Sequence, residues 1–240
     1  MIKNALQSLE YGFQLFDWYH ISWLLFTLLI IFILYKFYSK NNELHRRKMR
    51  IVWACLILLL EIIKNIVLLV QDSFWYGSWP LHLCGLGIFI ILAHAFVKGH
   101  QIDMLLYCLT MPGALMALIT PEWTHVSAFD YLHFHSFLFH CFLFAYPVVM
   151  LLTKELQLSI KKIWQPIAFL VVVVPPIYAL NVAWGTNFMF TRKAPAGTPL
   201  ILLEQHLPQY LYIVGFSGLV IVCWILLLLP IVVWKRIATK

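Results

Sequence analysis

The sequence predicts an all-α membrane protein with seven transmembrane helices, its N-terminus outside and its C-terminus in the cytoplasm. The chain has 240 residues, of which 62% are hydrophobic and 11% are charged, and its mean hydropathy is +0.85. A bilayer-spanning helix needs about 20 mostly apolar residues, and several stretches of this chain qualify. No internal repeat and no soluble domain is visible, so we expect residues 1–240 to form a single polytopic domain.

Seven apolar segments define the predicted helices. They cover residues 18–38, 51–70, 80–97, 102–119, 131–153, 163–184 and 207–234. The third and fourth are short and contain polar residues, whereas the seventh is long enough to tilt in the bilayer. In the third, Pro80 suits the first turn of a helix, because its missing N–H would have no partner there. In the sixth, Pro175-Pro176 predicts a bend.

The distribution of basic residues predicts the orientation and the class of partner. Thirteen of the 17 lysines and arginines lie at or beyond the ends of segments one, three, five and seven. The positive-inside rule places those ends in the cytoplasm. Since no basic tract is interleaved with aromatic residues, the formal charge of +7 does not indicate nucleic acid. We expect a multi-pass protein of the bacterial cytoplasmic membrane with membrane phospholipids as partners; assembly into a homo-oligomer is left open.

The stretch Trp79–Gly87 contains a proline, a histidine, a cysteine and two glycines between two apolar segments. Cys84 is expected about one turn inside a helix N-terminus, where the helix dipole favours a thiolate. It is either a nucleophile or a small packing residue. A nucleophile needs a base within reach, and His82 would point to nearly the opposite side of a regular helix. The glycines Gly85 and Gly87 would relax that constraint.

Glu61, Lys64 and Asn65 share one face of the second segment by their spacing. At 1.5 Å per residue, Glu61 lies about 15 Å from the start of that segment, near the middle of the bilayer. Charges at that depth are costly, so we expect them to pair and to face the bundle interior. The group is either a structural ion pair or the polar floor of a cavity that opens to the outside.

Three histidines of the fifth segment lie within eight residues of one another. His133 and His140 share a face, whereas His135 points elsewhere. One of them would serve as a base for Cys84, as a proton relay or as a metal ligand. Because no His-Glu-x-x-His pattern is present, we predict neither a metal nor another cofactor.

Two further groups are candidate substrate contacts. The side-chain amides of Asn65 and Asn181 can donate to an oxyanion. In the proline-rich loop before the last segment, Arg192 and Lys193 can attract phosphate head groups, or the loop is simply solvated.

Several of these features together resemble one family. They are the Trp79–Cys84 stretch, the Glu61–Asn65 face, Asp130-Tyr-x-His-Phe-His, Asn187-Phe-Met-Phe, and Leu207-Pro-x-Tyr. The chain resembles the YwaF-like bacterial integral membrane proteins, which are similar to vertebrate transmembrane protein 164. The resemblance implies a polytopic helical fold. It also implies a cysteine-dependent acyltransferase that moves fatty acyl chains between phospholipids, with Cys84 as the nucleophile.

The working hypothesis is therefore a membrane-embedded acyltransferase or lipid-ester enzyme with an outward-facing polar cavity. Cys84 would be the nucleophile and His140 or His133 its base, with Asn65 and Asn181 as positioning groups. One alternative is a transporter or ion-coupled protein that uses the Glu61, Lys64 and histidine cluster, although the cytoplasmic half is expected to lack polar residues. A seven-helix ligand-binding protein, such as a receptor or retinal protein, is the third class. Whether the chain is an enzyme, and with which acyl donor and acceptor, is left open.

Overall fold

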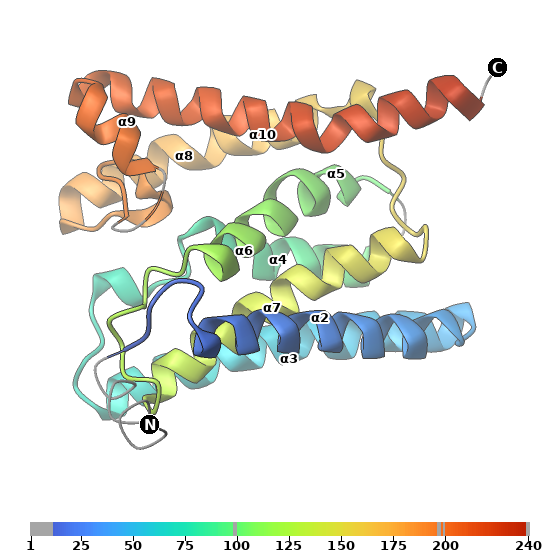
Figure 1. Cartoon of the computed structure of the whole chain (residues 1–240), viewed down its shortest axis with the longest axis horizontal. Coiled ribbons are helices and arrows are strands. Elements are labelled where there is room, and N and C mark those ends of the chain that lie inside the picture. The colour runs from blue at the N-terminus through green and yellow to red at the C-terminus, as the bar shows by residue number, and fades with distance from the viewer. Residues whose placement is uncertain (1–11, 98–99, 196–197, 199, 239–240) are drawn as a thin grey trace.

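The computed structural model describes residues 12–97, 100–195, 198 and 200–238, and within these ranges it contains helices and no strand. The helices run along one common direction (Figure 1). In chain order the long helices are α2 (Trp18–Ser39), α3 (Glu43–Val70), α4 (Leu83–Phe96), α7 (Tyr131–Leu152), α8 (Trp164–Trp184) and α10 (Gln209–Ala238). Between α4 and α7, a composite helix joins α5 (Asp103–Leu105), the π-helical η3 (Leu106–Thr110) and α6 (Met111–Ile119). The shorter elements are η2 (Tyr76–Ser78), η4 (Ile160–Lys162), η5 (Phe188–Phe190) and α9 (Leu200–His206).

The helices form layers around α7. In Figure 1, α8, α9 and α10 lie together at the top, α4, α5 and α6 lie below them, and α2 and α3 lie at the bottom. Helix α7 contacts α2, α3, α4 and α6. Its side chains Phe137, Leu143, Tyr146 and Val149 have no exposed surface, so α7 supplies the centre of the core.

Five helical segments are long and apolar enough to cross a membrane. These are α2, α3, α7, the segment Ile160–Trp184 that includes α8, and Tyr210–Ile231 within α10. The helices Leu83–Phe96 and Asp103–Ile119 are apolar but shorter. At 1.5 Å per residue, Leu83–Phe96 extends about 21 Å, less than the ~30 Å of hydrocarbon in a bilayer. All seven predicted segments are thus helical, and five meet the length needed to span.

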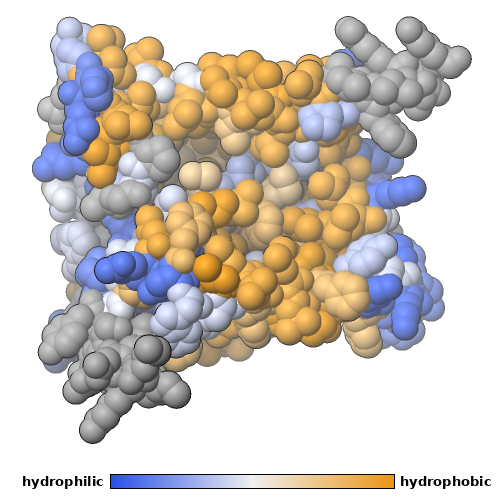
Figure 2. Space-filling view, in the orientation of Figure 1, coloured by the Kyte–Doolittle hydropathy of each residue, from blue (hydrophilic) through white to orange (hydrophobic). Residues whose placement is uncertain are grey.

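The surface carries an apolar band between two polar ends. Figure 2 shows hydrophobic residues across the middle of the molecule and hydrophilic residues gathered at both sides. The chain reverses direction between α3 and α4 (Figure 1), so Cys84 at the start of α4 and Arg50 near the start of α3 lie at opposite ends. We refer to these as the Cys84 end and the Arg50 end. The band and the length of the helices show a multi-pass membrane protein.

Helix α3 begins eight residues before the predicted start at residue 51, at Glu43. Asn42 caps it, because its side chain accepts a hydrogen bond from the His45 N–H at 3.1 Å. The first two turns of α3 contain charged residues. Hydropathy assigns these residues to a loop, but they are helical. As a result, Arg46 and Arg50 are held on a rigid element and face the bundle.

The two prolines of α8 do not interrupt it. The sequence predicts a bend at Pro175-Pro176, yet the helix is continuous from Trp164 to Trp184. Prolines remove the hydrogen bonds to the carbonyls of Val171 and Val172, four residues earlier. Both valines lie on the exposed surface of the helix, 66% and 70% exposed, so the loss falls outside the core.

The short α-helix α9, which ends at His206, was not predicted from the sequence. Pro208 separates it from α10, because proline cannot continue a helix but suits the start of the next one. The backbone N–H groups of Leu211 and Tyr212 bond to the Pro208 carbonyl at 2.8 and 3.1 Å. The last long helix therefore begins at Gln209 rather than at residue 207.

Helix α10 is fastened to the π-helical segment by two side chains. Pro112 has no N–H to offer to the Cys108 carbonyl four residues before it, and the Trp224 indole donates to that carbonyl at 2.8 Å. In return, the Tyr107 hydroxyl donates to the Leu227 carbonyl at 2.7 Å. These bonds link the layer of α8, α9 and α10 to the layer of α4, α5 and α6.

Candidate functional site

Cys84 is the second residue of α4 rather than lying one turn inside it, because the helix begins at Leu83 and not at Pro80. The difference arises because the Pro80 backbone folds back over the first turn. A Cβ on Gly85 would lie 2.5 Å from the Pro80 carbonyl oxygen, so only glycine fits there. Cys84 is half-buried, and its sulfur lies 4.0 Å from where a Cβ of Gly113 would stand. The bare backbone of α6 thus leaves room beside the thiol.

His82 precedes α4 and has an extended backbone, with φ −68° and ψ 157°. The helical geometry that would have turned it away from Cys84 therefore does not apply. Its Nδ1 accepts a hydrogen bond from the Met189 N–H at 3.3 Å, and its ring packs against Phe188 and Phe190. Since Nδ1 is an acceptor, the neutral ring carries its proton on Nε2.

His140 has the complementary tautomer. Its Nδ1 lies 2.7 Å from the Ser136 carbonyl oxygen, which can only accept, so Nδ1 carries the proton. Nε2 of the neutral ring is then free to act as a base. The ring stacks on Trp123 at 5.0 Å between centroids, and a positive charge on it would act on His82. The two imidazoles thus present a donor and an acceptor in one region of the Cys84 end.

A buried ion pair lies beside these histidines. Glu61 is 5% exposed and forms an ion pair with Lys64, which also donates to the Ser78 carbonyl at 3.1 Å. His135 joins from α7, with its Nε2 3.9 Å from the second oxygen of Glu61. Asn65 has a buried side-chain oxygen without a hydrogen-bond partner among the described residues. The predicted pairing of Glu61 with Lys64 is therefore present, and it faces α7.

His133 does not reach this group. Its ring is enclosed by Phe13, Tyr19 and Phe137, at 5.1 to 5.4 Å between centroids. His133 and His140 share a helical face, but seven residues separate them by about 10 Å along the axis. Their neighbours consequently differ, and it is His135 that approaches Glu61.

The side chain of Asn181 is hydrogen-bonded within the loop that follows α8. Its side-chain nitrogen donates to the Phe188 carbonyl and to the Thr191 hydroxyl, both at 2.9 Å. Its oxygen accepts from the Phe188 N–H at 2.7 Å and from the Thr186 hydroxyl at 2.8 Å. Both amide hydrogens are already bonded in this conformation, so donation from Asn181 to an oxyanion stays a prediction that would require the loop to open. It shapes the loop that carries Met189 to His82.

The two basic residues of this loop differ in their surroundings. The Arg192 guanidinium folds back and donates to the Asn181 carbonyl at 2.8 Å and to the Thr186 carbonyl at 3.4 Å. Lys193 is exposed. Arg192 therefore helps to close the loop, and Lys193 is the one of the two that faces solvent.

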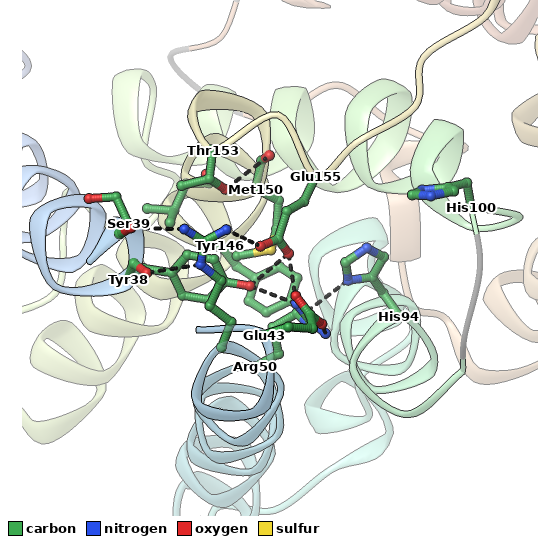
Figure 3. Close-up of polar contacts among 12 residues, drawn as sticks. Tyr38, Ser39, Glu43, Arg50, His94, His100, Tyr146, Met150, Thr153 and Glu155 are labelled. Atoms are coloured by element: carbon green, nitrogen blue, oxygen red, sulfur yellow. Dashed lines mark hydrogen bonds and ion pairs between the residues drawn. The ribbon is translucent and has the colours of Figure 1, made fainter. Parts of the chain in front are cut away.

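A second polar network at the Arg50 end was missed by the sequence analysis, which expected few polar residues there. Figure 3 shows Tyr38, Arg50 and Glu155 converging from α2, α3 and the segment after α7. Glu155 accepts from the Tyr38 hydroxyl and from Arg50, both at 2.7 Å. Arg46 lies 3.5 Å from its other oxygen. A lone acidic residue in a lysine-rich loop is the signal that would have indicated this ion pair.

The same network extends to α4 and α5. Asp103 has no exposed surface, and it accepts from the Gln157 N–H at 2.7 Å. His100 lies 2.8 Å from the same oxygen, and His94 lies 3.6 Å from the other. His94 in turn bonds to the Tyr146 hydroxyl at 2.8 Å. Among the described residues, no group of three histidines, cysteines or acids is arranged to hold a metal ion.

Comparison with known proteins agrees with the resemblance noted in the sequence. The model of the TMEM164 family matches residues 15–228, a range that includes Cys84, the histidines of α7 and the loop around Asn181. Neither the curated proteins nor the solved structures gave a match. The family match extends over nearly the whole chain, and this membrane protein therefore belongs to the TMEM164 family.

Proposed function

We propose that this protein is a cysteine-dependent enzyme of phospholipid esters, most simply an acyltransferase, with its site at the Cys84 end. The observation that carries the proposal is a pair of complementary histidine tautomers, that of His82 directly before α4 and that of His140, whose charge would act on His82. A thiol needs a base to become a nucleophile, and the carbonyl that it attacks needs a donor for its developing charge. His140 and His82 supply these two functions from different elements.

The proposed reaction has two halves. His140 Nε2 takes the proton of the Cys84 thiol, and the sulfur attacks the ester carbonyl of a phospholipid. His82 Nε2–H stabilises the oxyanion, which collapses to a thioester as the C–O bond breaks. The leaving lysophospholipid oxygen receives the proton from His140. A hydroxyl of a second lysophospholipid then attacks the thioester, with His140 taking its proton and returning it to the sulfur.

The remaining polar residues support this site. Lys64 and Glu61 lock α3 to the segment before α4 through the Ser78 carbonyl, and they bring the Lys64 ammonium near His82 and the Glu61 carboxylate to His135. Cys84 lies at the first turn of a 14-residue helix, whose N-terminal dipole favours a thiolate. We further propose that α4 and the α5–α6 helix complete seven spans, and that the Cys84 end faces outward.

Transport is the weaker alternative because of what lies between the two polar networks. Glu61 and Tyr146 belong to opposite networks, and between them Ile57, Ile91 and Leu143 have no exposed surface. These side chains belong to one continuous apolar core. A transported ion or proton would need a polar path, and these three apolar side chains provide none.

The test is transfer of a radiolabelled acyl chain from phosphatidylcholine to a lysophospholipid by the purified full-length protein in liposomes. Cys84→Ala should reduce transfer to background, and His140→Gln should reduce the rate about a hundredfold, as loss of a general base does. Cys55→Ala is the matched control, since Cys55 is an exposed cysteine of α3. Full transfer by Cys84→Ala would refute the nucleophile assignment, and no transfer by the unaltered protein would refute the activity.

A further inference from the structure

A cavity of about 430 Å³ lies at the Arg50 end, in the segment between α7 and α8. It opens to the surface, so a ligand can reach it without passing through the bundle. The residues that line it are Leu156, Gln157, Leu158, Ser159 and Lys162. None of these belongs to the proposed catalytic site, which is at the opposite end of the bundle.

The walls of this cavity are held in place by the buried network. The Gln157 N–H donates to Asp103, and the Lys162 ammonium donates to the His100 carbonyl at 3.4 Å. Lys162 also has its backbone N–H bonded to the Ser159 carbonyl at 2.9 Å, which closes the turn η4. The segment is therefore ordered without a ligand, although it has no long helix of its own.

The charge around the cavity is positive. The segment carries Lys154, Lys161 and Lys162 against a single acid, Glu155. That carboxylate already accepts from Arg50 and Tyr38, so it does not neutralise the lysines. The Asp103 carboxylate behind the Gln157 N–H has no exposed surface, so the charge that lines the cavity is the Lys162 ammonium, which favours an anion over a cation.

Polar groups remain available for such an anion. The Ser159 hydroxyl and the Gln157 side-chain amide have no hydrogen-bond partner within the described ranges, and Lys162 uses one of its three donors. The position of the cavity indicates the source of the anion. Ile160 and Trp164 beside it are 54% and 61% exposed, and an exposed tryptophan at the edge of an apolar band is typical of the membrane interface.

We propose that this cavity binds the phosphate of an anionic phospholipid head group, held by Lys162 and Ser159. Basic pockets between helices on the cytoplasmic side are suited to such head groups, and the positive-inside rule assigns the Arg50 end to that side. The site is independent of the proposed acyl transfer. It would select the lipid that surrounds the protein, whether or not the Cys84 end is catalytic.

Native mass spectrometry of the purified full-length protein tests this site with phosphatidylglycerol, with phosphatidylcholine and with inorganic phosphate. Phosphatidylglycerol should bind more tightly than phosphatidylcholine. Lys162→Gln should weaken its binding about tenfold, the cost expected for one charge-assisted hydrogen bond. Lys161→Gln is the matched control, because Lys161 is the exposed neighbour on the same turn and does not line the cavity. The affinity of the Lys161→Gln variant for phosphatidylglycerol should change by less than about twofold.

Ser159→Ala keeps every lysine and should weaken binding about threefold if its hydroxyl contacts the phosphate. Circular dichroism of each variant establishes that the fold is retained. Equal losses in Lys162→Gln and Lys161→Gln would overturn the proposal in favour of a diffuse basic surface. Inorganic phosphate that binds as tightly as phosphatidylglycerol would overturn the assignment to a lipid. Acyl transfer is measured separately, so failure of either proposal is recognised on its own.

Discussion

Replacing Glu155 by glutamine should destabilise the protein more than replacing Glu43, the other acidic partner of Arg50. Glu155 accepts from three groups on two helices, Tyr38, Arg46 and Arg50, so it joins α2 and α3 to the end of α7 (Figure 3). Its side chain is 17% exposed and that of Arg50 is 13% exposed. Glutamine preserves the shape and can still accept a hydrogen bond, but it leaves the two arginines without their shared negative charge.

The magnitude follows from this burial. Removing one partner of a fully buried ion pair costs about 3–5 kcal/mol, and the residual exposure of this pair lowers the figure to about 2–3 kcal/mol. A change of 1 kcal/mol moves the melting temperature of a chain of this size by about 2–4 °C. Glu155→Gln should therefore lower the melting temperature by about 4–12 °C in thermal unfolding of the purified protein followed by circular dichroism.

Glu43 offers a matched control on the same arginine. It contacts Arg50 at 2.8 Å, as close as Glu155 does, but its side chain is 72% exposed. Exposed pairs contribute about 0.5 kcal/mol, so Glu43→Gln should shift the melting temperature by about 2 °C or less. Equal shifts for the two variants would refute the conclusion that burial, rather than contact distance, determines the strength of this network.

Gly85→Ala, with Gly218→Ala as its control, and Asn181→Ala test the framework of the candidate site. Gly85→Ala should destabilise the turn before α4 and reduce the yield of folded protein, because the new Cβ meets the Pro80 carbonyl at 2.5 Å. Gly218→Ala has nothing within 4 Å and should be neutral or stabilising, so equal losses of folded protein on size-exclusion chromatography would contradict this view. Asn181→Ala removes four hydrogen bonds and should speed tryptic cleavage after Arg192 by up to about a thousandfold, since four buried bonds at about 1 kcal/mol each sum to about 4 kcal/mol. An unchanged cleavage rate would show that other contacts hold the loop.

The Glu61–Lys64 pair and the family motifs show where sequence-based inference succeeds. Spacing along a helix correctly grouped Glu61 with Lys64, because residues three apart face the same side and a charge in an apolar segment must find a partner. Motif resemblance correctly indicated the family. In both cases the information is local, within a few residues of the chain.

Contacts between distant segments could not be obtained in this way. His133 and His140 are equivalent by helical spacing, yet Phe13 and Tyr19 enclose the first, while Trp123 stacks on the second. Asn181 is an attractive oxyanion donor by composition, but the loop that follows α8 folds back and uses its whole amide. Which neighbour meets a side chain depends on how helices pack, and no pattern within one segment encodes that.

The sequence by itself determined the class of this protein. Long apolar runs with few charges must be helical in a bilayer, because every backbone N–H and C=O needs a partner within the segment. The tertiary structure decided which polar groups meet. The Asn42 cap begins α3 at Glu43, and the Pro80 backbone limits α4 to a start at Leu83, so these two helix starts depend on local contacts within a few residues. The meeting of Arg46 and Arg50 with Glu155 requires α3 to pack against the end of α7, which happens only once the chain has folded.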